Sequence, residues 1–162
     1  MSAHIAVDFE TFYSRKLKYG LKQLIAEQYC RSELFDCYLI SVCDGANTWA
    51  GHPRDFNWGT LEGRTLVSHN RYFDNTVYNE LVRRKLAPAM QFNGWHCTSN
   101  LSVYLCNRRA LQQAVEHLYP GTRISKDYRS VADGKNWPQD YSEAERAQVI
   151  AAGKQDAHWC WR

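Results

Sequence analysis

The chain opens with an alternation of apolar and polar residues that is typical of a half-buried strand. The alternation covers residues 3–9 and continues to Glu10, and successive side chains on a strand point to opposite faces of a sheet. One face therefore carries Ile5, Val7 and Phe9, and the other carries His4, Ala6, Asp8 and Glu10. The pattern predicts a strand that enters a core on one side and presents two acids on the other.

Two further apolar runs predict strands. Residues 38–43 (YLISVC) are rich in β-branched and aromatic side chains and lead into Asp44-Gly45, which is a turn signal. Residues 48–50 are expected to pair back on this strand as a hairpin. Residues 65–68 (TLVS) are expected to form a third, buried strand.

Helical spacing is prominent in the second half of the chain. Apolar residues recur at intervals of three and four over residues 74–86 and 109–118, and a proline follows each segment. Ser142 with Glu145 three residues later matches a capping box, which predicts a helix from there toward the C-terminus. The polar stretch 124–141 is expected to be a loop.

This succession of strands and helices predicts a mixed α/β domain around one sheet. The 162 residues, 44% of them apolar, are enough for one core, so we expect a single domain over residues 1–162. No apolar run approaches the roughly 20 residues that a membrane helix needs, so no membrane partner is expected. An acid already at position 8, with no basic region before an apolar stretch, favours a cytoplasmic protein.

The two acids of the opening strand require a positive partner. Asp8 and Glu10 leave the same face of the strand, with α-carbons roughly 6.5–7 Å apart. Carboxylates so close repel each other unless a basic side chain or a metal ion lies between them.

Two later acids are also predicted to point inward. Asp74 lies in line with Leu81 on the apolar stripe of its helix, and Asp156 shares a face of small residues with Gly153. An unpaired acid in a core is costly, so both acids fit a cation shared with the opening strand. The alternatives are that Asp74 is a helix N-cap and that Asp156 pairs with Lys154 or a distant arginine.

Together, Asp8, Glu10, Asp74 and Asp156 predict a two-metal carboxylate site. Hard oxygen ligands favour Mg²⁺ or Mn²⁺. Two such ions about 4 Å apart activate a water, position a phosphodiester and stabilise the leaving oxygen.

The motifs around these acids resemble those of the DEDD 3′–5′ exonucleases, which share the ribonuclease-H-like fold. The matching stretches are VDFETF with YG shortly after, VSHNRYFD, and a late helix that contains the final acid. The first two look most like the proofreading exonuclease domain of family A DNA polymerases from phages. The resemblance covers nearly the whole chain in order, and it implies an α/β fold with a ribonuclease-H-like mixed sheet flanked by helices. It also implies a polymerase as a partner or as a fused domain.

By position, the resemblance implies that the four acids are catalytic metal ligands. It places five further residues near the substrate strand, namely Thr11, Phe12, His69, Asn70 and Phe73. The chain departs from the family at the residue that orients the attacking water. The family has a tyrosine four residues before the last acid or a histidine five before it, whereas this chain has Ala152 and Ala151. Another group, such as His158, or the metal alone would then orient the water.

The charge distribution permits an anionic partner. The net charge is +3, and basic residues gather in three clusters, the first of them interleaved with tyrosines. Basic residues mixed with aromatics suit a phosphate backbone with stacked bases, although solvated helix faces also explain them. The clusters are Arg15, Lys16, Lys18 and Lys22; Arg83, Arg84 and Lys85; and Arg108 and Arg109.

The six cysteines include no C-x-x-C pair, and several lie in apolar stretches, so we interpret them as small buried side chains. A zinc site at His96 and Cys97 is the weaker alternative, because the paired ligand spacing is missing.

The sequence thus supports a metal-dependent 3′–5′ exonuclease that hydrolyses the terminal phosphodiester of single-stranded or frayed DNA, with RNA also open. Two alternatives remain. One is a nucleic-acid-binding module of the same fold with weak or no catalysis, favoured by Ala151 and Ala152. The other is a junction or RNA·DNA hybrid nuclease that cuts internally. No polymerase domain follows in these residues, which fits either a free-standing exonuclease or a piece of a longer protein.

Overall fold

The computed structural model describes residues 4–162, so Ala3, the first residue of the predicted opening strand, lies outside the described residues. The strands form one five-stranded sheet with the order β3-β2-β1-β4-β5. They are β1 (His4–Thr11), β2 (Cys37–Cys43), β3 (Thr48–Gly51), β4 (Thr65–Ser68) and β5 (Gly94–Cys97). The strands β1, β2 and β3 pair antiparallel, whereas β4 and β5 run parallel to β1. The mixed α/β sheet predicted from the sequence is confirmed.

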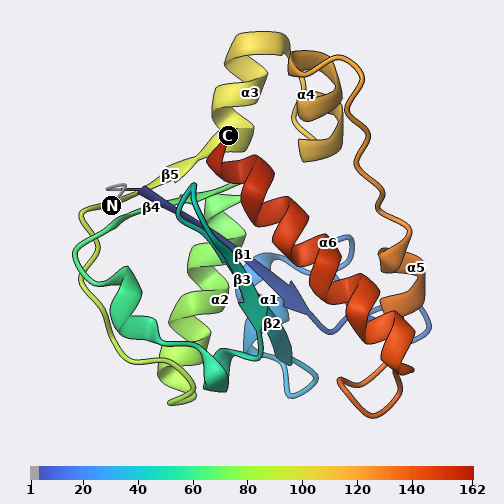
Figure 1. Ribbon diagram of the computed structural model, residues 1–162. Coiled ribbons are helices and arrows are strands. Elements are labelled where there is room, and N and C mark those ends of the chain that lie inside the picture. The colour runs from blue at the N-terminus through green and yellow to red at the C-terminus, as the bar shows by residue number, and fades with distance from the viewer. Residues whose placement is uncertain (1–3) are drawn as a thin grey trace.

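Helices lie on both faces of this sheet. Figure 1 shows α6 crossing one face, while α2 lies on the other, and α3 and α4 lie together beyond one end of the sheet. The helices are α1 (Ala26–Arg31), α2 (Arg71–Arg83), α3 (Thr98–Cys106), α4 (Leu111–Leu118), α5 (Tyr128–Ala132) and α6 (Glu143–Trp161), with short 3₁₀ turns η1 (Pro53–Asp55) and η2 (Trp58–Leu61).

Several predicted bounds agree with the structure, and some are corrected. The hairpin of β2 and β3 is present, and its turn is held by the Asp44 side chain, which accepts hydrogen bonds from the backbone of Ala46 and Asn47. The segment 124–141 is not all loop, because α5 forms within it. The helix expected over residues 74–86 begins three residues earlier, at Arg71, and β5, α1 and α3 had not been predicted.

The two faces of β1 meet different layers, as its alternation predicted. Ile5, Val7 and Phe9 pack into the larger core with residues of α1 and α2. Ala6 packs on the opposite side against Ala157 of α6. Asp8 and Glu10 belong to this second face by strand alternation, so the two acids lie beneath the last helix.

Gly153 sets how closely α6 approaches the sheet. A methyl group at this position would lie 2.4 Å from Ser41 Oγ and 2.8 Å from a methyl of Leu39, both on β2. Only a residue without a side chain therefore permits this separation between helix and sheet. The capping box predicted at the start of α6 is present, with Ser142 and Glu145 each bonding the backbone of the other. The close approach brings the next turn of α6, with Asp156, onto β1.

Candidate metal centre

Three of the four predicted acids converge in the structure. Asp8 and Glu10 from β1 meet Asp156 from α6, and one ligand oxygen from each lies within 4.8 Å of the other two. Asp156 is 5% exposed, whereas Asp8 and Glu10 keep part of their side chains in contact with solvent. Within residues 4–162, this is the one group of three or more acidic, histidine or cysteine side chains with that spacing.

Asp74 lies near this group, but it is not among the residues whose ligand oxygens lie within 4.8 Å of one another. The residue is 3% exposed in the first turn of α2, and its charge is one of the causes that raise the pKa of Asp8. The N-cap of α2 is Asn70, so the alternative interpretation of Asp74 as the N-cap is wrong. Its backbone N–H donates to the Asn70 carbonyl at 3.1 Å, which fixes the start of the helix next to the carboxylates.

Two residues that no sequence pattern pointed to contact the acids. Lys126 forms an ion pair with Asp156 through its Nζ atom. The Tyr128 hydroxyl, at the start of α5, donates a hydrogen bond of 2.8 Å to Glu10 Oε1. The same hydroxyl lies 3.4 Å from Asp156 Oδ2. The partner of Asp156 is thus neither Lys154 nor an arginine. Both residues lie in the stretch 124–141, which the sequence predicted to be a loop. This stretch has no periodic pattern from which the direction of their side chains could be predicted.

The acids are only partly satisfied by these contacts. Asp8 Oδ2 and Asp156 Oδ1 are buried and have no hydrogen-bond partner in the described structure. Buried carboxylate oxygens without partners are costly in a native fold, so these two atoms are available to a ligand. The orphaned atoms lie on the two elements that the site joins, β1 and α6.

The electrostatics of the group favour a cation. Burial, followed by the negative charges of Glu10 and Asp156, raises the pKa of Asp8 well above its usual value. Burial and the Asp156 charge raise the pKa of Glu10 from 4.5 to about 7, against the opposing effect of the Tyr128 hydrogen bond. Burial also raises the pKa of Asp74. These carboxyl groups hold protons more tightly than usual, and a divalent ion would relieve the same repulsion.

The donor set fits Mg²⁺ or Mn²⁺. All the converging ligand atoms are carboxylate oxygens, which these hard cations prefer, and Asp8 Oδ2 and Asp156 Oδ1 have no hydrogen-bond partner in the described residues. The zinc alternative does not gain support, because His96 and Cys97 are not part of any metal-like group in the described residues. All six cysteines are free, and four of them are buried, as expected for small core side chains.

The predicted substrate residues at the end of β1 and directly after it are already engaged inside the fold. Thr11 is 9% exposed, and its Oγ1 accepts a hydrogen bond of 2.7 Å from the Tyr29 hydroxyl. Phe12 is buried in the main core and stacks on Tyr19, with ring centroids 6.0 Å apart. Both residues follow Glu10 directly in the sequence, and both already have partners within the fold.

The three predicted residues before Asp74 have different surroundings. The ring nitrogens of His69 lie 3.0 Å from Thr98 Oγ1 and 2.6 Å from the Arg109 carbonyl, and burial lowers the pKa of the imidazole. Asn70 is exposed at the start of α2, and Phe73 packs against the main core. Of the three, Asn70 has its side chain on the surface, and His69 joins β4 to the segment between α3 and α4.

The positions of the missing water-orienting residue are occupied by small side chains, as the sequence shows. Ala151 is exposed, and Ala152 packs at the margin of the cluster beneath α6. His158, the suggested substitute, packs edge-on against Trp159, with ring centroids 5.2 Å apart. The hydroxyl that contacts the acids comes instead from Tyr128.

The basic clusters are partly used within the fold. Arg83 and Arg84 both bind Glu80, and Arg15 pairs with Asp133. Arg109 Nη1 donates to Ser99 Oγ at 3.4 Å. These arginines therefore have structural partners.

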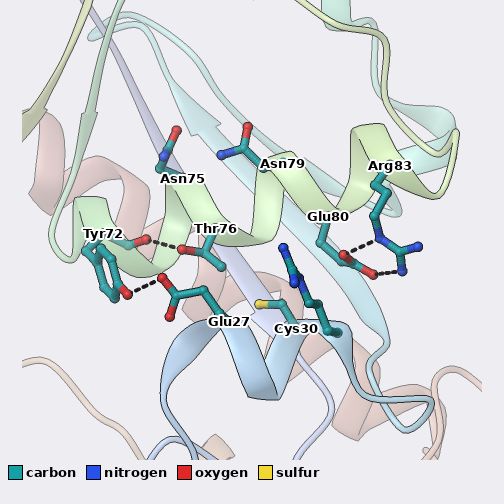
Figure 2. Close-up of a pocket in the computed structure, with 9 residues that line it drawn as sticks. Glu27, Cys30, Tyr72, Asn75, Thr76, Asn79, Glu80 and Arg83 are labelled. Atoms are coloured by element: carbon teal, nitrogen blue, oxygen red, sulfur yellow. Dashed lines mark hydrogen bonds and ion pairs between the residues drawn. The ribbon is translucent and has the colours of Figure 1, made fainter.

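Two of the hollows on the described surface are relevant to the site. Figure 2 shows the smaller one, about 280 Å³, between α1 and α2, where Tyr72 bonds Glu27 and Arg83 bonds Glu80. It lies on the face of the sheet that α2 covers and is separate from the converging acids. The larger hollow, about 840 Å³, is lined by α4 and by the segment 121–127, which includes Lys126. Lys126, which pairs with Asp156, connects this second hollow to the acidic group.

The sheet order and the helices on both faces define an α/β fold of the ribonuclease-H-like class. Among solved structures, the chain is similar to NrnC from Brucella melitensis, with a TM-score of 0.63 and 15% identity. A structure of NrnC with bound Mg²⁺ gives 0.62 and 15%, and one of NrnC bound to pGG gives 0.61 and 18%. Each match covers 100% of this chain and 70% of NrnC. At these identities the likeness establishes the shared fold. No protein-family model and no curated protein sequence matches the chain.

None of the helices in the described residues is both long enough and apolar enough to cross a membrane.

Proposed function

We propose that this chain is a divalent-metal-dependent nuclease that hydrolyses phosphodiester bonds from the 3′ end of a single-stranded or frayed nucleic acid. The observation that supports this most directly is the convergence of Asp8, Glu10 and Asp156 with two buried carboxylate oxygens left unpaired. The proposed ligands are these three acids and Asp74, and the proposed cofactor is Mg²⁺ or Mn²⁺, bound as two ions.

The proposed roles follow from where each residue lies. Asp8 and Glu10 are held by β1, and Asp156 is held by α6, so rigid elements fix the ligand positions. A bound divalent ion would supply a water activated near neutral pH and a positive charge for the leaving oxygen. The Tyr128 hydroxyl donates to Glu10, and we propose that it orients the nucleophilic water, a role that Ala152 cannot perform.

The substrate class is supported by the fold and by the surface beside the site. NrnC, which has the same fold, has been solved with Mg²⁺ and with pGG. Arg123 and Lys126 line the larger hollow, Lys126 also pairs with Asp156, and positive side chains favour a phosphate backbone. We propose DNA 3′ ends as substrate, with RNA as the alternative, and the resemblance to phage proofreading domains supports a polymerase as partner or fused domain.

The test is a time course on 5′-labelled single strands of DNA and RNA, and on pGG, with Mg²⁺, Mn²⁺ or EDTA. A metal-dependent ladder that shortens from the 3′ end is expected, and a strand with a blocked 3′ end should resist. Asp8→Asn should reduce the rate by about 10³-fold or more, because the lost ligand contributes several kcal/mol to the transition state. The matched control is Asp55→Asn, an exposed aspartate in η1. Equal rates for wild type and Asp8→Asn would overturn the site assignment.

A second candidate function is a nucleic-acid-binding module with weak or no catalysis. It is favoured by Ala151 and Ala152 and by the ion pair of Lys126 with Asp156, which occupies one carboxylate of the site. This candidate predicts salt-sensitive binding of single strands without any metal-dependent product. Cleavage that requires added metal and is lost in Asp8→Asn would exclude this second candidate function.

A further inference from the structure

A lysine ammonium lies within the acidic group. The side chain of Lys126 is 17% exposed, its Nζ pairs with Asp156 Oδ2, and the ammonium lies 5.8 Å from the centre of the Tyr128 ring. The side chain of Asp156 is 7% exposed. A lysine so enclosed is rare unless it is paired, so the acid and the base hold each other in place.

We propose that Lys126 is an internal counter-ion that a divalent metal displaces from Asp156. The inference rests on the proposed metal site. It adds that the Lys126 side chain has two positions, one without metal and one with metal. Without metal, the Lys126 ammonium holds Asp156. With metal bound, Asp156 would serve as a ligand free of the lysine, and Lys126 would lie in the adjacent hollow.

The charges in the group favour the exchange. One ammonium pairs with Asp156 and is the basic group whose charge acts on both Asp8 and Glu10, and Asp8 Oδ2 and Asp156 Oδ1 remain unsatisfied. A divalent ion carries twice the charge and accepts several oxygens at once, whereas the lysine bonds a single Asp156 oxygen. A cation bound to Asp156 would also repel the ammonium that pairs with the same carboxylate.

The space that the lysine needs is present. Lys126 itself lines the hollow of about 840 Å³ between α4 and the segment 121–127. Glu116 and Asp127 line the same hollow and offer carboxylates to the displaced ammonium. The movement requires only rotation about side-chain bonds, because the Lys126 carbonyl stays bonded to the backbone N–H of Arg129 at 3.1 Å. Release of Lys126 beside Arg123 would make the hollow more basic when metal is bound.

The first measurement is calorimetric titration of Mg²⁺ and Mn²⁺ into wild type, Lys126→Met and Lys154→Met. Lys154 is an exposed lysine on α6, two residues from Asp156, and serves as the matched control. If the lysine-bound form makes up about 90% of the metal-free protein, removing it should tighten the apparent metal Kd by about tenfold. Lys154→Met should leave the Kd unchanged.

The second measurement follows the lysine directly and does not depend on cleavage. The protein is treated briefly with an amine-acylating reagent with Mg²⁺ or with EDTA, and the extent of reaction at each lysine is read by peptide mass spectrometry. An ammonium held against Asp156 reacts slowly, so acylation of Lys126 should increase several-fold with Mg²⁺. Lys154 should react equally in both conditions.

The outcomes separate this inference from the proposed function. Tighter metal binding by Lys126→Met together with metal-induced reactivity of Lys126 supports the exchange. Metal binding to wild type with no change at Lys126, and equal or weaker binding to Lys126→Met, overturns the exchange but leaves the nuclease proposal standing. Absence of metal binding in all variants overturns both. Binding by Lys126→Met alone overturns the exchange, because the metal then fails to displace the lysine in the wild type.

Discussion

Replacing Glu10 by glutamine should stabilise the metal-free protein at alkaline pH, although it removes a proposed metal ligand. Burial and the charge of Asp156 raise the pKa of Glu10 from 4.5 to about 7. The folded protein therefore binds this proton more tightly than the unfolded chain does. Its contribution to stability is fully present below pH 4.5 and is lost as the pH rises through about 7. Glutamine is uncharged at every pH and keeps an oxygen to accept the Tyr128 hydrogen bond.

The magnitude follows from the two pKa values. At about 1.4 kcal/mol per pH unit, the interval from 4.5 to about 7 corresponds to an upper value of about 3 kcal/mol. Glu10 keeps some contact with solvent, which reduces this to about 1–3 kcal/mol. For a chain of this size, such a difference raises Tm by roughly 2–10 °C. Glu10→Gln should thus melt higher than wild type at pH 8 and equally at pH 4.5.

The assay is thermal or urea unfolding in EDTA between pH 4.5 and 8.5, with the exposed Glu33→Gln as the surface control. Addition of Mg²⁺ should then reverse the order at pH 8, because a ligated cation stabilises the wild type and binds the variant less well. The reasoning is refuted if Glu10→Gln is less stable than wild type at pH 8 in EDTA. It is also refuted if the difference between them does not change with pH.

Three further predictions concern packing, capping and the buried hydroxyl. Gly153→Ala should lower the unfolding free energy by about 1–3 kcal/mol, because its methyl would lie 2.4 Å from Ser41 Oγ, whereas Gly94→Ala, with its nearest neighbour at 3.9 Å, should change it little. Ser142→Ala should cost about 0.5–2 kcal/mol through loss of the α6 cap, and an unchanged urea midpoint would contradict this. Tyr128→Phe should cost about 1–3 kcal/mol at pH 8, because it removes a donor from Glu10, and the loss should shrink at pH 5, where Glu10 is protonated.

The elements with regular patterns were predictable from the sequence. The alternation in β1 placed Asp8 and Glu10 on the face that α6 covers, and the capping box gave the first turn of α6. The small-residue face of α6 predicted correctly that Asp156 would point into the fold, where it is 5% exposed. Such patterns are informative because burial imposes a period of two on strands and about 3.6 on helices.

The contacts that complete the site were not predictable in the same way. Lys126 and Tyr128 belong to a polar stretch that includes a helix of only five residues, too short to show a period. Their positions depend on how this stretch returns across α6, which is a property of tertiary packing. The same holds for β5, whose four residues (GWHC) show no clear alternation and pair only because β4 presents an open edge. The ligand roles of the four acids stay a prediction for the metal experiments to test.

The docking of α6 has a consequence for how the protein opens. Asp156 lies on the buried face of α6, the last helix. The acids that it meets, Asp8 and Glu10, belong to the first strand, β1. A bound divalent ion would therefore join the two ends of the fold and oppose local undocking of α6. At a metal concentration of 100 times Kd, linkage adds about 2.7 kcal/mol to such an opening, which slows amide exchange in this helix about 100-fold. Amide exchange in α2, on the other face of the sheet, would report whether that protection stays local or extends to the whole fold.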